Sequence, residues 1–255
     1  MFDKKQKNNT PQPDNMLIEG RNAVSELIKS GQAVDKLFVA ESAHGRMGEV
    51  IALAKKKGIP VTICDRRKLD SMSQTGNHQG VIAQAAAQDY VSLDELFERA
   101  EQKGEQPLFV ICDGLEDPHN LGAIVRSAEA AGAHGIIIPK RRAVGLTGIV
   151  ARASAGALSH MPVHKATNLA STIDEIKKRG VWVYGAEADG TVDLYKADFA
   201  GATALVIGSE GSGISRLIRE KCDFIVSIPM RGQVNSLNAS NAAAILLYEA
   251  LRRRI

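Results

Sequence analysis

Blocks of apolar and polar residues alternate along most of the chain and predict alternating helices and strands. Between residue 16 and about residue 84, the helical patterns GRNAVSELIKSG and GRMGEVIALAKKKG are interspersed with the strand-like runs DKLFVA, PVTIC and GVIAQAA. Gly31 and Gly58 follow the helical patterns, as is typical of helix ends. A segment of roughly 70 residues is near the lower size for independent folding. We therefore expect a small α/β domain here.

A second, larger unit is predicted after residue 106. The buried-looking strand LFVICDG leads into the helical pattern PHNLGAIVRSAEAAG and then into a further strand, GIIIP. A strand–helix–strand unit of this kind implies a parallel sheet. The runs VWVYGAE, ATALVIGSEG and DFIVSIPM add three strands, each followed by glycine, proline or small polar residues. The fold class is therefore α/β, with a parallel sheet in residues 107–255.

The remaining segments are predicted to be a tail and a linker. Residues 1–15 are polar and are expected to be disordered. Residues 85–106 are expected to connect a domain at 16–84 to the larger domain. Within this linker, Ser92 and Glu95 form a capping box, which predicts the start of a charged helix.

The composition is that of a globular protein and sets few limits on function. The chain has 255 residues, of which 44% are hydrophobic and 24% charged, and its formal net charge is +3. No stretch approaches the ~18 uncharged apolar residues of a membrane span, and the N-terminus lacks the apolar core of a signal peptide. The three cysteines lie in or beside apolar runs without metal-ligand spacing, which indicates reduced thiols. We expect a soluble, cytoplasmic protein with no metal and no membrane partner.

Polar residues gather where the predicted strands end, the edge at which open α/β sheets bind ligands. The stretch IPMRGQVNSLNAS, residues 228–240, holds more serines and asparagines than a helix start needs. Ser236 or Asn238 can be the N-cap, but only one of them can occupy that position. The surplus indicates a polar ligand. Loops at Gly185–Glu187, Gly208–Gly213 and Met230–Asn241 are therefore candidates for one shared site.

Other candidate groups have plainer explanations as well. Glu210 lies between glycines, in a loop without P-loop or Rossmann spacing, and could be an ordinary solvated turn residue. Asn120 sits where a helix N-cap belongs, and Arg126 projects from another face of the same helix with Glu129 three residues later. Basic clusters such as Lys140-Arg141-Arg142 could neutralise phosphates or simply cover a solvated face.

Three stretches carry a resemblance to a known family. NLGAIVRSAEAAG (120–132), LVIGSEGSGIS (205–215) and IPMRGQVNSLNASNAAAILLYEALRRR (228–254) resemble, in order and spacing, the three motifs of the SpoU/TrmH family of RNA 2′-O-ribose methyltransferases, within the SPOUT class. Residues 16–84, which include IEGRNAVSELI, resemble the small ribosomal-protein-like substrate-binding domain of many of these enzymes. The two-domain whole most resembles the bacterial 23S rRNA guanosine-2′-O-methyltransferases of the RlmB group.

The resemblance implies properties that composition and spacing do not show. The parallel-sheet domain would contain a deep trefoil knot, S-adenosylmethionine would be the methyl donor, and a guanosine of 23S rRNA would be the acceptor. The protein would be a homodimer with its C-terminal helix in the interface. The apolar stripe of that helix permits this interface; it consists of Ala243, Ala244, Leu247 and Leu251.

The motif match also implies three sets of site residues. The catalytic set is Asn120, Arg126, Glu210, Ser236 and Asn238. The donor-binding set is Gly208, Ile228 and Leu237, to which we add Gly185, Met230 and Gly232. The RNA-binding set is Arg231, Arg21 and Arg141. Arginine has a pKa above ~12 and no acceptor while charged, so we expect Arg126 to stabilise the developing alkoxide rather than act as base. Glu210 would orient Arg126 and could assist as base.

Three alternatives stay open at this point. A tRNA 2′-O-methyltransferase would share all three motifs. A non-catalytic RNA-binding or ribosome-assembly factor would keep the basic clusters, but would not need Arg126, Glu210 and Asn238 together. A small-molecule α/β enzyme would not need the domain at residues 16–84.

Overall fold

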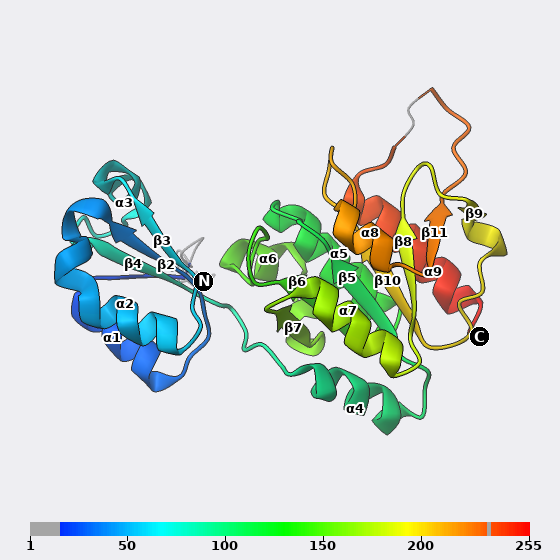
Figure 1. The fold of residues 1–255 in the computed structure, drawn as a ribbon, viewed down its shortest axis with the longest axis horizontal. Coiled ribbons are helices and arrows are strands. Elements are labelled where there is room, and N and C mark those ends of the chain that lie inside the picture. The colour runs from blue at the N-terminus through cyan, green and yellow to red at the C-terminus, as the bar shows by residue number, and fades with distance from the viewer. Residues whose placement is uncertain (1–15, 234–235) are drawn as a thin grey trace, which may run out of the picture.

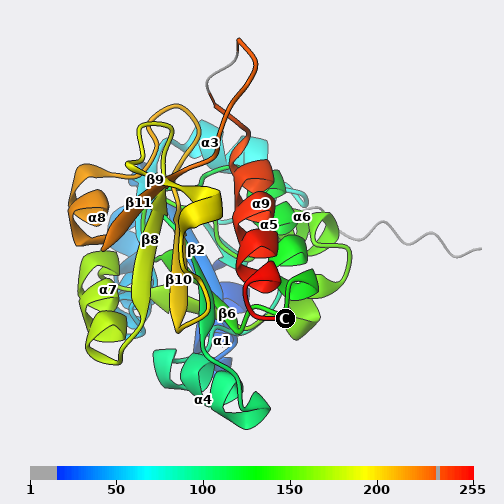
Figure 2. The ribbon, with the colours of Figure 1, turned by 90° about the vertical axis from the view of Figure 1, so that its right-hand side faces the viewer.

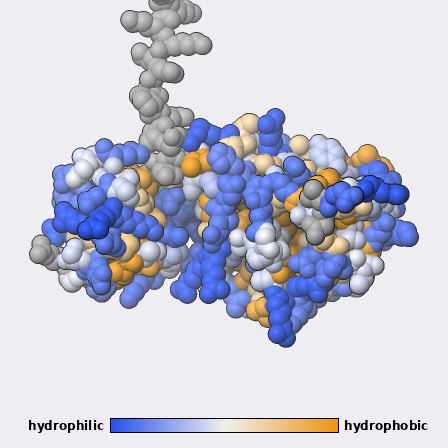
Figure 3. All heavy atoms as spheres, turned by 90° about the horizontal axis from the view of Figure 1, so that it is seen from above, coloured by the Kyte–Doolittle hydropathy of each residue, from blue (hydrophilic) through white to orange (hydrophobic). Residues whose placement is uncertain are grey.

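The structure, a computed structural model, describes residues 16–233 and 236–255, which form two domains side by side (Figure 1). The tail expected to be disordered, residues 1–15, lies outside the described residues. Hydrophilic side chains cover most of both domains in the view from above (Figure 3).

The smaller domain is a four-stranded mixed sheet with helices on both faces. Its strand order is β1-β4-β2-β3, and only the β2–β3 pair is parallel. In chain order, the elements are β1 (Leu17–Glu19), α1 (Arg21–Ser30), β2 (Val34–Ala40), a 3-10 helix (Glu41–Met47), α2 (Gly48–Lys56), β3 (Val61–Cys64), α3 (Arg66–Met72) and β4 (Val81–Ala85).

Alternating strand side chains divide the core of the smaller domain into two layers. Leu37 and Val39 of β2 pack with α1 and α2, whereas Phe38, between them, packs with Leu69 of α3. This is the period-two pattern of a strand that is covered on both faces. The helix expected from GRNAVSELIKSG is confirmed: α1 spans Arg21–Ser30, and Gly31 is its C-cap.

The connecting segment packs against the larger domain. Helix α4 (Leu93–Lys103) begins with the predicted capping box, in which Ser92 accepts from the Glu95 amide and Glu95 accepts from the Ser92 amide. Leu93 and Leu96 of α4 join the core below the larger sheet. Before α4, the Val91 amide donates to Val163 O, so this part of the segment is also tied to the larger domain.

The larger domain is a seven-stranded sheet in which every neighbouring pair is parallel, as the sequence predicted. The strand order is β7-β6-β5-β10-β8-β11-β9. The strands are β5 (Leu108–Cys112), β6 (Gly135–Pro139), β7 (Val163–Ala166), β8 (Trp182–Ala186), β9 (Val192–Asp193), β10 (Thr203–Ile207) and β11 (Phe224–Ser227). The trefoil knot implied by the resemblance stays a prediction.

Helices cover both faces of this sheet (Figure 2). The α-helices are α5 (Pro118–Ala130), α6 (Gly148–Ala153), α7 (Leu169–Lys178), α8 (Arg216–Lys221) and α9 (Ala239–Arg252), with short 3-10 turns at Ala157–His160 and Leu194–Lys196. Helices α5, α6 and α9 share one hydrophobic core with the sheet, whereas α4, α7 and α8 share the other. The carboxyl ends of the parallel strands therefore remain open to loops.

The stripe expected at a homodimer interface lies partly inside the chain. Ala243 and Leu247 are buried in the core between α9, α5 and the sheet, so they are not available to a second copy. The reason is that α9 packs against α5 of its own chain. On the outer side of α9, Tyr248 is 53% exposed. The homodimer itself stays a prediction.

Candidate active site

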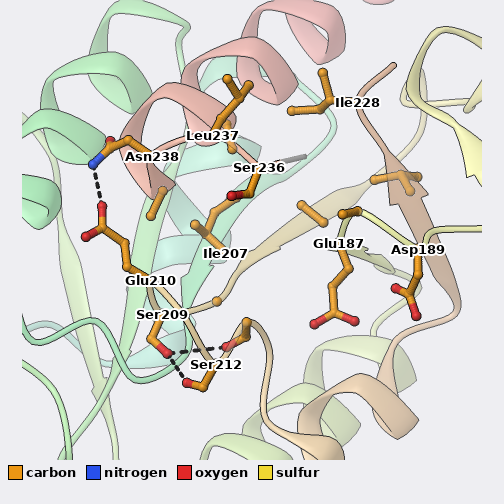
Figure 4. Close-up of a pocket in the computed structure, with 18 of the residues that line it drawn as sticks. Glu187, Asp189, Ile207, Ser209, Glu210, Ser212, Ile228, Ser236, Leu237 and Asn238 are labelled. Carbon is orange, nitrogen blue, oxygen red and sulfur yellow. Dashed lines mark hydrogen bonds between the residues drawn. The ribbon is translucent and has the colours of Figure 1, made fainter. Parts of the chain in front are cut away.

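Three loops at the carboxyl ends of neighbouring strands line one pocket of about 810 Å³, which we call the first pocket. They follow β8, β10 and β11, and they include residues 186–189, 207–213 and 236–239 (Figure 4). These are the loops that the sequence indicated as one shared site. Parallel strands bring them together because their carboxyl ends meet at one edge of the sheet.

One wall of the first pocket is apolar. Ile207, Ile228, Met230 and Leu237 line it. Gly208 allows a close approach of the backbone, because a Cβ there would overlap the backbone of Gly213 and Ile214. A side chain at this position would displace the loop, so the wall needs glycine.

The facing wall carries two carboxylates held by one arginine. Arg219 Nε donates to Glu187 Oε2 at 2.6 Å, and Arg219 Nη2 donates to Asp189 Oδ2 at 3.0 Å. The Glu187 hydrogen bond and the charge of Asp189 raise the pKa of Arg219. The Ile214 amide donates to the other Glu187 oxygen at 2.9 Å. Glu187 therefore braces the loop after β8 against the loop after β10.

Three side chains from distant parts of the chain meet at Glu210. Asn120 Nδ2 donates to Glu210 Oε1 at 3.1 Å, Asn238 Nδ2 donates to the same oxygen, and Asn238 Nδ2 also donates to Asn120 Oδ1 at 2.9 Å. Among the described residues, Glu210 Oε2 has no hydrogen-bond partner. We call Asn120, Glu210 and Asn238 the polar triad. It holds one carboxylate oxygen and leaves the other free.

Asn238 has a second task in the same place. Its Oδ1 accepts from the Ser240 amide at 2.9 Å, which makes it the N-cap of α9. Of the two N-caps that the sequence allowed, Asn238 rather than Ser236 is therefore used. Ser236 lines the first pocket. One amide side chain thus starts the helix with its oxygen and joins the triad with its nitrogen.

The expected cap of α5 was wrong, and the reason bears on the site. Asp117 is the N-cap, its Oδ1 accepts from the His119 amide at 2.9 Å, and Pro118 occupies the first helical position. Proline is favoured there because its missing N–H is not needed. Asn120 is thus the third helical residue, buried, and its side chain is free to reach Glu210.

A second pocket of about 640 Å³ lies on the other side of residues 209–213. Ser209, Glu210, Ser212 and Gly213 line both pockets, so Glu210 stands in a shared wall. The rest of the second pocket is rich in charge. Its other lining residues include Asp113, Glu116, Asp117, Arg141 and Arg142, with Asn120 of the polar triad.

Arg126 does not join this arrangement within the chain. It is exposed on α5, lines neither pocket, and forms no hydrogen bond or ion pair with any residue in 16–233 or 236–255. Six residues turn a helix by about 600°, so Arg126 and Asn120 point from different faces. Glu210 is held by two asparagines instead of orienting Arg126.

Four other expected site residues lie outside the two pockets. Gly185 is buried within β8, and Arg231 and Gly232 are exposed beyond the lining of the first pocket. Arg21 begins α1 and lines a pocket of about 570 Å³ in the smaller domain. By contrast, Arg141 lines the second pocket.

Some lining residues had no role in the sequence analysis. Ser209 and Ser212 flank Glu210, and a search for polar groups in its glycine-rich loop could have found them. Arg142 follows Arg141 in a noted basic cluster. Asp113 gave no signal, because a single acid after a strand is common.

Two other features bear on the function. No three histidine, cysteine or acidic side chains within residues 16–233 and 236–255 are grouped to hold a metal ion. Within the same residues, none of the helices combines the length and apolarity needed to cross a bilayer.

The fold and site define an α/β protein with two pockets at one edge of a parallel sheet. Glu210 lines both pockets. Residues 107–248 match the model of the SpoU rRNA methylase family. Residues 17–91 match the model for RNA 2′-O ribose methyltransferase substrate binding. The chain belongs to the SpoU/TrmH family of RNA methyltransferases.

Similar proteins agree with this assignment. YacO of Bacillus subtilis, whose name assigns it to the TrmH family of tRNA/rRNA methyltransferases, is 56% identical over 93% of this chain and 95% of its own. The SpoU methyltransferase AviRb from Streptomyces viridochromogenes, solved with AdoMet, is 29% identical with a TM-score of 0.60, covering 94% of this chain and 90% of its own. The TrmH/SpoU tRNA-modifying enzyme of A. aeolicus is 28% identical with a TM-score of 0.53, covering 62% and 83%.

Proposed function

We propose that this protein transfers a methyl group from S-adenosylmethionine to the ribose 2′-hydroxyl of a guanosine in 23S rRNA. The observation that carries the proposal is the position of Glu210. Its carboxylate stands in the wall between two pockets, with one oxygen bound by Asn120 and Asn238 and the other without a hydrogen-bond partner in residues 16–233 and 236–255. A donor on one side and a ribose on the other would meet at this wall.

The first pocket fits the methyl donor in size and chemistry. Its volume of about 810 Å³ lies within the ~300–1,000 Å³ typical of ligand pockets. Ile228, Met230 and Leu237 would hold the adenine by apolar contact, and Gly208 would let the backbone approach it. Glu187 and Asp189 add negative charge, which favours a cationic ligand. When bound, S-adenosylmethionine supplies a methyl group on a positively charged sulfur. The bound AdoMet in the similar enzyme AviRb supports this assignment.

The polar triad would act on the ribose. A hydroxyl is a weak nucleophile until its proton leaves, so a carboxylate within hydrogen-bond reach helps the reaction. A 2′-hydroxyl in the second pocket could donate to the free Oε2 of Glu210, while Asn120 and Asn238 hold Oε1. Ser236, on the side of the first pocket, would help to position the reacting groups. The reaction then rests on positioning and a proton acceptor.

We assign Arg126 and the other RNA-binding arginines to the negatively charged phosphates of RNA. An exposed arginine can neutralise an RNA phosphate without leaving its helix, and this is the role we give Arg126, Arg21 and Arg231. Arg141 and Arg142 would contact the phosphates that flank the target ribose. We also propose a homodimer, with the exposed Tyr248 on the outer face of α9 as the first residue to test.

Two findings favour ribosomal RNA over transfer RNA. The matching family model is described for rRNA methylases, and a separate substrate-binding model covers residues 17–91. The choice of guanosine rests on the resemblance to the RlmB group. A transferase that acts on tRNA is the second candidate.

Labelled S-adenosylmethionine tests the proposal directly. The protein is incubated with unmodified 23S rRNA and tRNA transcripts, and the labelled nucleosides are identified after digestion. We expect 2′-O-methylguanosine from 23S rRNA, and a loss of about 100-fold or more in the rate for Glu210→Gln. Glu98→Gln, an exposed site on α4, is the matched control. Label in tRNA alone would overturn the substrate but keep the reaction, and label in neither RNA would contradict the proposal.

A further inference from the structure

A buried ion pair joins the two domains. Asp35, near the start of β2 in the smaller domain, accepts from Lys165 Nζ of β7 in the larger domain at 2.6 Å. The two side chains are only 5% and 13% exposed. The hydroxyl of Tyr90, in the connecting segment, donates to the same Asp35 oxygen. Three parts of the chain therefore meet at one carboxylate, although Lys165 follows Asp35 by 130 residues.

Tyr90 fixes the group further. Its hydroxyl accepts from the Leu146 amide at 3.1 Å, and the Lys165 ammonium lies 4.3 Å from the centre of its ring. Gly145 closes the remaining side, because a Cβ there would overlap the Asp35 carboxylate. We call Asp35, Tyr90 and Lys165 the interdomain cluster.

The interdomain cluster is not optimal for stability alone. Asp35 Oδ2 is buried and has no hydrogen-bond partner among the described residues. Buried ion pairs gain little stability because desolvation offsets their attraction, and an unsatisfied oxygen adds to the cost. A pair of this kind does impose one geometry, since breaking it leaves a charge buried alone. Its contribution is therefore to the relative orientation of the domains.

The same loop that touches the cluster also lines the second pocket. Pro139, Arg141 and Arg142 line that pocket, and Gly145 and Leu146 contact Asp35 and Tyr90 a few residues later. Between them, Lys140 Nζ lies against the smaller domain, 2.7 Å from where a Cβ on Gly58 would stand. A change in the orientation of the smaller domain would therefore move residues 139–147 and one wall of the second pocket.

We propose that Asp35, Tyr90 and Lys165 are positioning residues that set the orientation of the smaller domain and, through residues 139–147, the shape of the second pocket. RNA held by the smaller domain then presents its ribose at Glu210. This inference rests on the proposed function. It states which residues keep the smaller domain, which would bind RNA, aligned with Glu210.

Three single variants of the full chain test the interdomain cluster. Lys165→Met removes the cation, Asp35→Asn removes the anion with little change in size, and Tyr90→Phe removes only a hydroxyl. We expect kcat/KM for 23S rRNA to fall by roughly tenfold or more in the first two, and less in Tyr90→Phe. The Kd for S-adenosylmethionine should stay within about twofold, because no cluster residue lines the first pocket. Lys165→Arg, which keeps the charge, should recover most of the loss.

Small-angle X-ray scattering supplies a readout that does not depend on activity. The wild type should give one fixed domain arrangement, and Lys165→Met a broader distribution of distances with an unchanged S-adenosylmethionine Kd. Lys221→Met is the matched control, since Lys221 and Asp174 also pair at 2.6 Å but within the larger domain. The double variant Asp35→Asn/Lys165→Met should be no worse than the worse single variant, because both remove one interaction.

The outcomes separate the inference from the proposed function. Wild-type kcat/KM and unchanged scattering in folded Lys165→Met and Asp35→Asn would overturn the positioning role while methyl transfer stands. A wild type that transfers no methyl group would refute the proposed function, and the scattering comparison would still support or refute the cluster. A loss in S-adenosylmethionine affinity equal to the loss in kcat/KM would also count against the inference.

Discussion

The two pockets on either side of residues 209–213 differ in what their walls offer. The first is lined by backbone and by apolar side chains such as Ile207, Ile228 and Leu237, with Glu187 and Asp189 on one side and Glu210 on another. The second is lined mainly by acids, two arginines and Asn120. Shape and close approach would select the ligand of the first pocket, whereas Arg141 and Arg142 would bind phosphates of the ligand of the second. The difference indicates that donor and acceptor affinities can be changed independently, with Glu210 as the group that both pockets need.

The largest expected effect is on donor binding in the first pocket. In Gly208→Val, the new side chain must displace the backbone of Gly213 and Ile214. We expect the Kd for S-adenosylmethionine to rise by at least about 100-fold, roughly 2.7 kcal/mol. The RNA Kd should rise by less, because of the displaced residues only Gly213 also lines the second pocket. Calorimetry for the donor and filter binding for RNA measure the two constants.

Gly201→Ala is the control for this substitution, because nothing lies within 4 Å of a Cβ at Gly201. Equal losses of donor and RNA affinity in Gly208→Val, with an unchanged melting temperature, would show that the pockets are not independent.

A change in the shared wall should affect catalysis more than binding. Asn238→Asp keeps the oxygen that caps α9, but it replaces the amide donor with a second carboxylate beside Glu210. The two negative charges repel and the polar triad opens, so we expect kcat to fall by about 100-fold. Single-turnover methylation measures this effect. The same change three residues later, Asn241→Asp, should leave kcat within about threefold of wild type. A wild-type kcat in Asn238→Asp would remove the triad from the mechanism.

The second pocket should respond to the loss of its cations. In Arg141→Ala/Arg142→Ala, we expect the RNA Kd to rise about tenfold and the slope of log Kd against log salt to fall by about 1.5 to 2, as for two lost phosphate contacts. The donor Kd should not change. Arg216→Ala on α8 removes an exposed arginine paired with Glu220 and serves as control. An unchanged salt slope in the double variant would place the RNA backbone elsewhere.

The smallest expected effect concerns the stability of the larger domain and its dependence on pH. His134 is buried, its Nδ1 accepts from the Leu108 amide at 3.0 Å, and its Nε2 lies 3.1 Å from Glu105 Oε2. The pKa of His134 is lowered to about 4, mainly by burial and also by the charge of Lys103, against the opposing effect of Glu105. The unfolded chain therefore binds a proton first as the pH falls.

This linkage predicts a loss of stability below pH 6.5 that ends near pH 4. The loss should be up to about 1.4 kcal/mol per pH unit, measured by urea unfolding. His134→Gln should flatten the slope between pH 6.5 and 4, and a slope equal to that of the wild type would contradict the assignment. A loss of activity between pH 6.5 and 4 would then result from unfolding of the protein and not from a change in either pocket.

Local signals in the sequence were enough for most of the fold. The capping box at Ser92 and the glycine after α1 are short-range features, and the structure has both. The three loops of the first pocket could also be foreseen, because strand ends in a parallel sheet share one edge. The prediction that Asn120 caps α5 also used only neighbouring residues, and it was wrong. Asp117 followed by Pro118 is the stronger signal for a helix start.

Features that depend on distant segments could not be predicted in this way. The apolar stripe of α9 is visible in the sequence, but periodicity does not say that α5 of the same chain covers Ala243 and Leu247. The pairing of Glu210 with Asn120 and Asn238, rather than with Arg126, depends on which helix face meets the loop. The contact between Asp35 and Lys165 spans both domains and leaves no pattern in either segment.

A crystal structure with S-adenosylhomocysteine tests the division of roles between the pockets most directly. The predicted result is the ligand in the first pocket, in contact with Gly208, Ile228 and Leu237, with its sulfur toward Glu210. The ligand in the second pocket, against Arg141 and Arg142, would contradict the assignment of donor and acceptor to the two sides of the wall.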